Sequence, residues 1–193
     1  MNRTEIEVKL NQDRVWLLEQ YAAMSDDDRS RPITTSKHDG AAQWSAKDHL
    51  VHLSGIERAF NRMVRRHLEG DPNPVGLGSK PDGSAPTREE MVRVLKETTE
   101  DALRKREAIM SRVHAMNEEW VAKHRDKSFN EVVALGQKVR GETLELLASL
   151  TDEQLQEQLP GAPWGDGTIG GVMAINGDHA RSHYKSVAAG LAR

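Results

Sequence analysis

The sequence contains no cysteine. This absence excludes a disulfide framework, a thiolate zinc site and a thiol nucleophile, so any metal or covalent chemistry must use other side chains. A strong excess of either charge is also missing, because 27 basic and 30 acidic side chains leave a formal net charge of −3. With both signs mixed along the chain, nothing in the charge favours a nucleic-acid partner.

Long apolar runs are missing as well. None approaches the roughly 20 residues that a membrane-spanning helix needs, so we expect no membrane partner. Residues 1–7 read MNRTEIE, which is too acidic and too interrupted for the apolar core of a secretory signal. We therefore expect a soluble cytoplasmic protein, and the length of 193 residues predicts one domain over residues 1–193.

Signals for the start of a helix recur along the chain. In a capping box, a Ser or Thr side chain and an acid or amide three residues later each satisfy a backbone N–H that the first turn leaves unpaired. The matching pairs are Thr4 with Glu7, Ser45 with Asp48, Thr87 with Glu90, Ser128 with Glu131 and Thr151 with Gln154. Such repetition favours an all-α protein.

The apolar residues that follow most of these starts have helical spacing, and strand alternation appears nowhere at useful length. The expected helices cover about 4–23, 45–69, 87–113, 115–125, 128–149 and 168–190. The stretch from 87 to 125 is either one long helix or two. Segments 71–86 and 159–167 are rich in Pro and Gly and are expected to be loops.

Two pairs of histidines carry the strongest chemical signal. His179 and His183 are four residues apart, so they lie one turn apart on one face of the last expected helix. Two imidazoles that point into a bundle can hold a divalent ion, although packed or exposed histidines also occur at this spacing. A third ligand could come from His49, near the middle of an apolar stripe, or from His52 at its edge. Periodicity alone does not choose between them.

The segment WSAKDHLVHL (44–53) resembles the motif that opens the second helix of the DinB/YfiT-like superfamily. In that family a metal-binding histidine stands eight residues after the tryptophan, and His52 occupies this position. His179 and His183, preceded by PWGDGT (163–168), are similar to the closing helix that supplies the other two ligands. The resemblance implies that His52, His179 and His183 hold a divalent metal.

The same resemblance implies an all-α four-helix bundle with additional short helices between helices 2 and 3, and it implies a homodimer. The four bundle helices would be about 4–23, 45–69, 128–149 and 168–190. Three imidazoles leave a coordination position for water or substrate, and nitrogen ligands suit Zn or Ni. The expected activity is that of a thiol S-transferase or hydrolase on a small electrophile, with bacillithiol, mycothiol or glutathione as a possible thiol cosubstrate.

Glu57 lies five residues after His52, close to the same helical stripe. It could orient a ligand imidazole or act as a catalytic general base, and the simpler alternative is an exposed Glu that pairs with a nearby Arg. Segments 117–129 and 150–155 resemble the DfsB/ClbS-like branch of the family, which leaves open a metal-free hydrolase with Glu57 as its base. A further alternative is a protein that sequesters a reactive small molecule without turnover.

Overall fold

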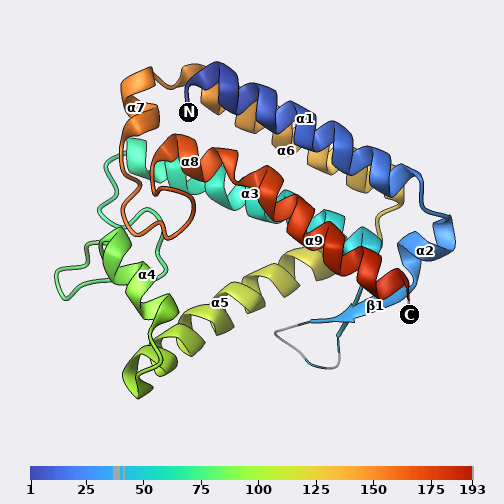
Figure 1. Ribbon diagram of the computed structural model, residues 1–193, viewed down its shortest axis with the longest axis horizontal. Coiled ribbons are helices and arrows are strands. Elements are labelled where there is room, and N and C mark those ends of the chain that lie inside the picture. Colours follow the sequence, from blue (N-terminus) through green and yellow to red (C-terminus); the bar gives the residue numbers. More distant parts are fainter. Residues whose placement is uncertain (37–39, 41, 193) are drawn as a thin grey trace.

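The computed structural model describes residues 1–36, 40 and 42–192, and the chain is mostly helical (Figure 1). The long helices are α1 (Arg3–Ala22), α3 (Ala46–Leu68), α5 (Glu100–His124), α6 (Phe129–Ser149) and α9 (Asn176–Leu191). The shorter ones are α2 (Asp26–Ser30), α4 (Arg88–Lys96), α7 (Asp152–Gln156) and α8 (Ile169–Ala174). Strands β1 (Pro32–Thr35) and β2 (Gln43–Ser45) form a small antiparallel hairpin.

Helices α1, α3, α6 and the α8–α9 segment make a four-helix bundle. α3 packs against α6 and α9, while α1 packs against α6, α8 and α9. The bundle confirms the expected all-α fold. Among the described residues, no helix is both long enough and apolar enough to cross a membrane.

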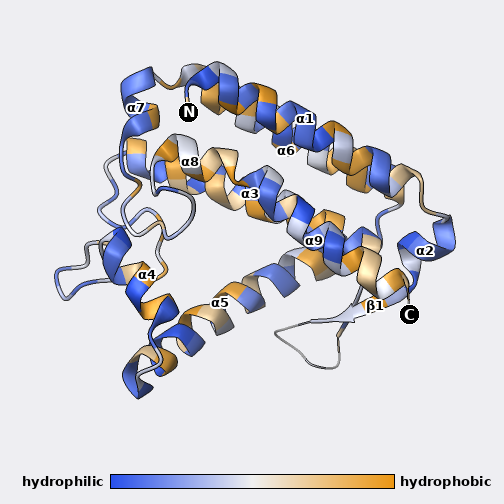
Figure 2. Ribbon diagram, in the orientation of Figure 1, coloured by the Kyte–Doolittle hydropathy of each residue, from blue (hydrophilic) through white to orange (hydrophobic). Residues whose placement is uncertain are grey.

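The apolar core consists of two clusters that lie in different halves of the bundle. One contains Ile6, Leu10, Phe60, Val64, Leu146, Leu147, Ile169 and Met173, and the other contains Leu17, Tyr21, Leu50, Val51, Leu53, Val132, Ala180 and Val187. Figure 2 shows the mixture of apolar and polar residues along each of these helices. On every bundle helix a buried polar residue lies between the two clusters, namely Asp13, Glu57, Arg140 and Asn176. We call these four residues and their polar neighbours the polar layer.

Four of the five expected capping boxes are present, at Ser45, Thr87, Ser128 and Thr151. The prediction for Thr4 was wrong, because Asn2 caps α1 instead. The Asn2 side chain accepts a hydrogen bond from the Glu5 N–H, and the Glu5 carboxylate accepts one from the Asn2 N–H. Asn is as good an N-cap as Ser, and using it starts the helix two residues earlier.

Two helix boundaries and the small hairpin differ from the expectation. The stretch 87–125 forms two helices, but the break falls at residues 97–99, where Thr99 caps α5, and not near residue 114. α5 is therefore 25 residues long, so the elaboration between α3 and α6 includes more than short helices. The stretch 168–190 is also divided, into α8 and α9 at Ile175. The hairpin was not expected, because strands of three and four residues are too short for alternation to show.

Candidate metal centre

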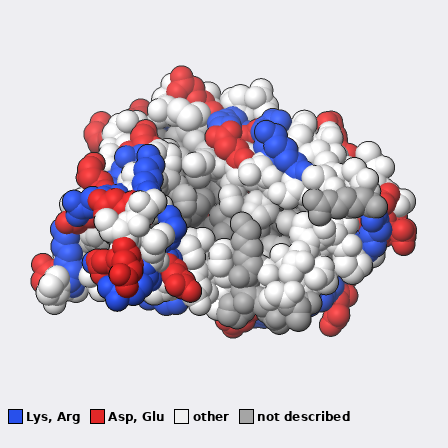
Figure 3. Space-filling view, turned by 60° about the horizontal axis from the view of Figure 1, so that its bottom comes forward, with Lys and Arg blue, Asp and Glu red and all other residues white. Residues whose placement is uncertain are grey.

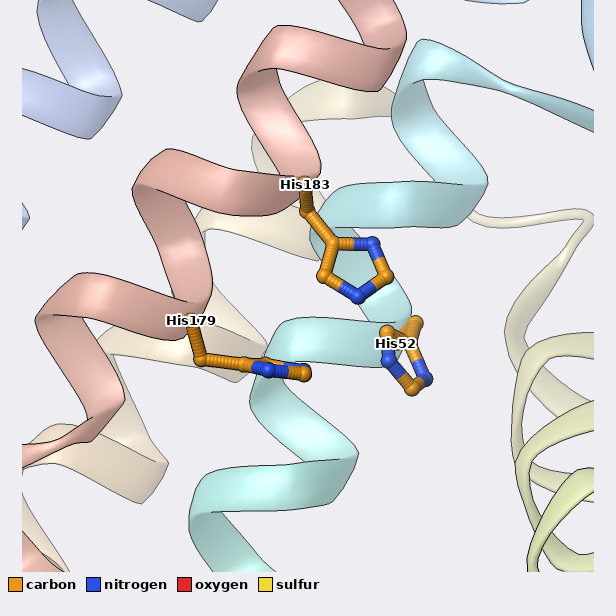
Figure 4. Close-up of side chains that lie close together, drawn as sticks. All are labelled: His52, His179 and His183. Carbon is orange, nitrogen blue, oxygen red and sulfur yellow. The ribbon is translucent and has the colours of Figure 1, made fainter. Parts of the chain in front are cut away.

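His52 on α3 and His179 and His183 on α9 come together between the two helices. Their ring centroids are 5.7 Å apart for His52 and His179, 4.6 Å for His52 and His183, and 4.5 Å for His179 and His183. One nitrogen from each ring lies within 4.8 Å of the others, and the three rings converge in Figure 4. Residues 127 positions apart along the chain are thus combined into a group that could hold a metal ion.

Burial favours the neutral form of His52 and His179. His52 is only 4% exposed, and its pKa is lowered to about 2, first by burial and then by the neighbouring His183 and His179. Burial also lowers the pKa of His179 below its ordinary value. A neutral imidazole keeps the nitrogen lone pair that a metal ion requires, so these two rings are in their ligand form at neutral pH.

The polar atoms of the site fit a metal. Nε2 of His179 is buried and has no hydrogen-bond partner, which is costly for a polar atom inside a protein. A divalent ion at the centre of the three rings would satisfy such a nitrogen. Three neutral nitrogen donors are also the ligand set of catalytic sites that keep one position open.

His49 lies behind the cluster and supports His183. Nδ1 of His49 is 3.0 Å from Nδ1 of His183, and Nε2 of His49 is 2.8 Å from Oγ1 of Thr34 in β1. In Figure 4 the other nitrogen of His183 points toward His52 and His179. If that nitrogen is a ligand, Nδ1–H of His183 donates to His49 and Nε2–H of His49 donates to Thr34. In this series of hydrogen bonds, each ring nitrogen of His183 and His49 then acts either as a donor or as an acceptor, without conflict.

The pKa of His49 is lowered to about 4, mainly by burial, so it accepts as a neutral ring at pH 7. We expect His49→Ala to weaken metal binding about 10- to 100-fold, because removing the partner that orients a metal-ligating His has this effect. Competition with a chromogenic chelator measures the change, and His67→Ala, near the exposed end of α3, is the matched control. An affinity that His49→Ala leaves unchanged would show that the hydrogen bond to His183 is incidental.

Trp44 of β2, just before α3, packs against the same cluster. Its ring centroid is 5.4 Å from that of His49 and 5.3 Å from that of His52. The Trp44 Nε1–H donates to Glu118 of α5 at 2.8 Å, which fixes the indole against the two imidazoles. The tryptophan that opens the sequence motif therefore lines one side of the site.

Glu57 does not lie on the surface, so the alternative of an exposed side chain was wrong, although the pairing with an Arg that this alternative included is present. It is 4% exposed, and its Oε1 and Oε2 accept hydrogen bonds from Arg140 at 2.6 and 3.2 Å. The hydroxyl of Thr143 donates to Oε1 at 2.8 Å. Both carboxylate oxygens are thus engaged in the polar layer, and a role for Glu57 as a base stays a prediction.

The face that carries α4 and α5 is hollowed. In Figure 3, Lys, Arg, Asp and Glu crowd the end of the molecule formed by α4 and the start of α5, and the depression beside it is mostly uncharged.

Fold and site together define a helical-bundle protein with a possible three-His metal centre. The sequence pattern of the DinB superfamily matches residues 39–187, a span that includes all three histidines. The chain therefore belongs to the DinB superfamily, as its motifs indicated.

The comparison with curated proteins gave no match. Among solved structures, the chain is similar to the crystal structure of an uncharacterised protein from Escherichia coli UTI89. The TM-score is 0.61 and the sequence identity 15%, over 97% of this chain and 91% of that chain. At this identity the likeness supports the fold alone.

Proposed function

We propose that this protein is a metal-dependent enzyme that activates a thiol or a water molecule against a small electrophilic substrate, as a thiol S-transferase or hydrolase. The convergence of three imidazoles carries this proposal, since one nitrogen of each ring lies within 4.8 Å of the others. Membership of the DinB superfamily, in which we matched these positions to metal ligands, supports it.

In this proposal His52, His179 and His183 hold the ion, and Zn or Ni suits their nitrogen atoms. A bound divalent ion supplies Lewis acidity, which lowers the pKa of a thiol or water at the open position. His49 orients the ring of His183, and Trp44 packs against the imidazoles from the side of α5. Because the chain has no cysteine, a sulfur nucleophile must come from a cosubstrate such as bacillithiol, mycothiol or glutathione.

A turnover assay with and without metal tests the proposal. Protein treated with a chelator is compared with the same protein reloaded with Zn or Ni, and conjugation of each thiol to monochlorobimane is followed by fluorescence. We expect turnover that depends on the metal and that His179→Ala removes. Equal turnover in metal-free and reloaded protein would contradict the metal dependence on which the proposal rests.

The small-molecule partner and the homodimer also belong to this proposal. Both follow from the family resemblance, and light scattering after size exclusion measures the assembly directly. A monomer at assay concentration would contradict the dimer without affecting the metal centre, because α3 and α9 of one chain supply all three histidines.

A further inference from the structure

His52 is held in the candidate metal centre by packing, whereas His183 is held by its hydrogen bond to His49. Within the described part of the chain, no hydrogen bond reaches a nitrogen of His52. Its ring packs against the indole of Trp44, with the two ring centroids 5.3 Å apart and the planes tilted by 44°. The orientation of His52 therefore depends on where the Trp44 indole is held.

The Trp44 indole has one polar atom, and Glu118 of α5 binds it. Nε1–H of Trp44 donates to Oε2 of Glu118 at 2.8 Å, and Trp44 is buried. A buried indole N–H requires an acceptor, and a carboxylate makes a charge-assisted hydrogen bond that is stronger than a neutral one. This bond holds one edge of the indole in place while the ring packs against His49 and His52.

Glu118 is itself held by the end of α5 and the start of α3. Its Oε1 accepts a hydrogen bond from Nη2 of Arg125 at 3.2 Å. Nε of Arg125 lies 3.8 Å from Oδ1 of Asp48, in the first turn of α3, and Oδ2 of Asp48 accepts from the Ser45 backbone N–H. Because Ser45 directly follows Trp44, this series of contacts returns to the residue from which it began.

α5 also contacts α3 directly beside His52. Nε1–H of Trp120 donates to the backbone carbonyl of Val51 at 3.0 Å. A Cβ atom on Gly55 would overlap the ring of Trp120, so this close approach requires glycine in the middle of α3. Glycine at such a position reduces helix stability, and the contact with α5 is what it permits. The distance between α5 and His52 is thus fixed by backbone and side chain together, which gives Glu118 a defined position.

We propose that Glu118 is a positioning residue of the metal centre and that it acts on His52 through the Trp44 indole. The inference rests on the proposed function, since His52 is a ligand only if the three histidines hold a metal. Residues that orient a ligand imidazole contribute to metal affinity although they do not touch the ion. His49 has this role toward His183, and Trp44 with Glu118 has it toward His52. The additional helix α5 is thereby part of the support of the site.

The zinc affinity of Glu118 variants, measured by competition with a chromogenic chelator, tests this role. Glu118→Ala removes the acceptor of the indole N–H, and the affinity should fall about tenfold, the lower end of the loss that removing such an outer partner causes. Glu118→Gln keeps an amide oxygen as acceptor and should stay within about twofold of the wild type. Glu119→Ala, at an exposed neighbour on α5, is the matched control and should leave the affinity unchanged. Equal losses in Glu118→Ala and Glu118→Gln would overturn the proposal.

A double-mutant cycle with Trp44→Phe tests whether Glu118 acts through the indole. Phe keeps an aromatic ring beside the imidazoles but has no N–H for Glu118. The double variant Trp44→Phe/Glu118→Ala should therefore bind zinc no more than about twofold more weakly than the weaker single variant. Losses that multiply, to about a hundredfold in the double variant, would overturn the proposal. If Glu118→Ala does not fold, a zinc affinity that Trp44→Phe leaves unchanged overturns it as well.

The indole resonance of Trp44 gives a readout that needs no metal. The chain has four tryptophans, and Trp44→Phe identifies the indole signal of Trp44 in the ¹H–¹⁵N spectrum of metal-free protein. In Glu118→Ala this signal should move upfield and its N–H should exchange faster with solvent, because the hydrogen bond is lost. Glu118→Gln and Glu119→Ala should keep the N–H protected from exchange. A signal and an exchange rate that Glu118→Ala leaves unchanged would overturn the proposal.

Cobalt loading separates a positioning role from a loss of stability. The visible absorption of bound Co²⁺ reports the arrangement of its ligands, so it should change in Glu118→Ala and match the wild type in Glu118→Gln. A variant that is merely less stable keeps the wild-type spectrum in its folded fraction. If Glu118→Ala has the affinity and the spectrum of the wild type, the positioning role is wrong and the proposed function stands. A wild type that takes up neither zinc nor cobalt overturns the proposed function, and the positioning role with it.

Discussion

Replacing Glu57 by Gln should lower the free energy of unfolding by about 3–5 kcal/mol. The substitution removes the countercharge of Arg140, which is also buried and donates a hydrogen bond to the Leu10 carbonyl as well. Breaking a buried ion pair on one side has this cost because the remaining charge stays uncompensated in the interior. Urea denaturation followed by circular dichroism measures the change, and the Tm should fall by at least about 6 °C.

Glu107→Gln is the matched control for this experiment, since Glu107 lies exposed on α5. Glu107→Gln should change the free energy of unfolding by no more than about 0.5 kcal/mol. The pair of variants also separates the two roles considered for Glu57. If Glu57→Gln left stability unchanged and abolished turnover, Glu57 would be a catalytic base and its place in the polar layer would not explain its presence.

Replacing His179 by Ala should weaken zinc binding about 10²- to 10⁴-fold. The expectation follows from dividing a typical zinc-binding free energy of about 10–16 kcal/mol among a site's ligands, which gives about 3–5 kcal/mol for each. The buried Nε2 atom of His179 has no hydrogen-bond partner in the protein. Replacing His179 by Ala therefore breaks no hydrogen bond made by Nε2 in the metal-free protein. Chelator competition measures the affinity.

His67→Ala serves as the control because His67 pairs with Glu157, away from the three-His cluster. Circular dichroism must show that both variants remain helical. A zinc affinity that His179→Ala and His67→Ala change equally would mean that the cluster on α3 and α9 is not the metal site.

Most of the helical framework could be predicted because local signals specify it. Capping boxes such as Ser45 with Asp48 place a helix start within one residue, and the apolar stripes identify the buried faces. The break at residues 97–99 was less visible, because Glu97 ends α4 in an extended conformation without the Gly or Pro that usually marks a helix end. The hairpin was missed because its strands depend on each other for pairing.

The candidate site also combines features that local sequence signals predict with features that depend on contacts between distant elements. The spacing of His179 and His183 and the motif around His52 predicted the three histidines that the structure brings together, because spacing on a helix and a family pattern are both local. The roles of His49 and Glu57 depend on Thr34 and Arg140, which lie on other elements. Periodicity placed His49 on a buried stripe but could not show that it contacts His183.

The most direct test of the metal centre is the metal content of protein purified without a histidine tag. We expect close to one equivalent of a divalent transition metal in the wild type, and very little in His179→Ala that remains helical. The arrangement of His52, His179 and His183 supports this result, because one nitrogen of each ring lies within 4.8 Å of the others. If the wild type neither carries metal nor takes up Zn or Ni, the three-His account of this protein is wrong.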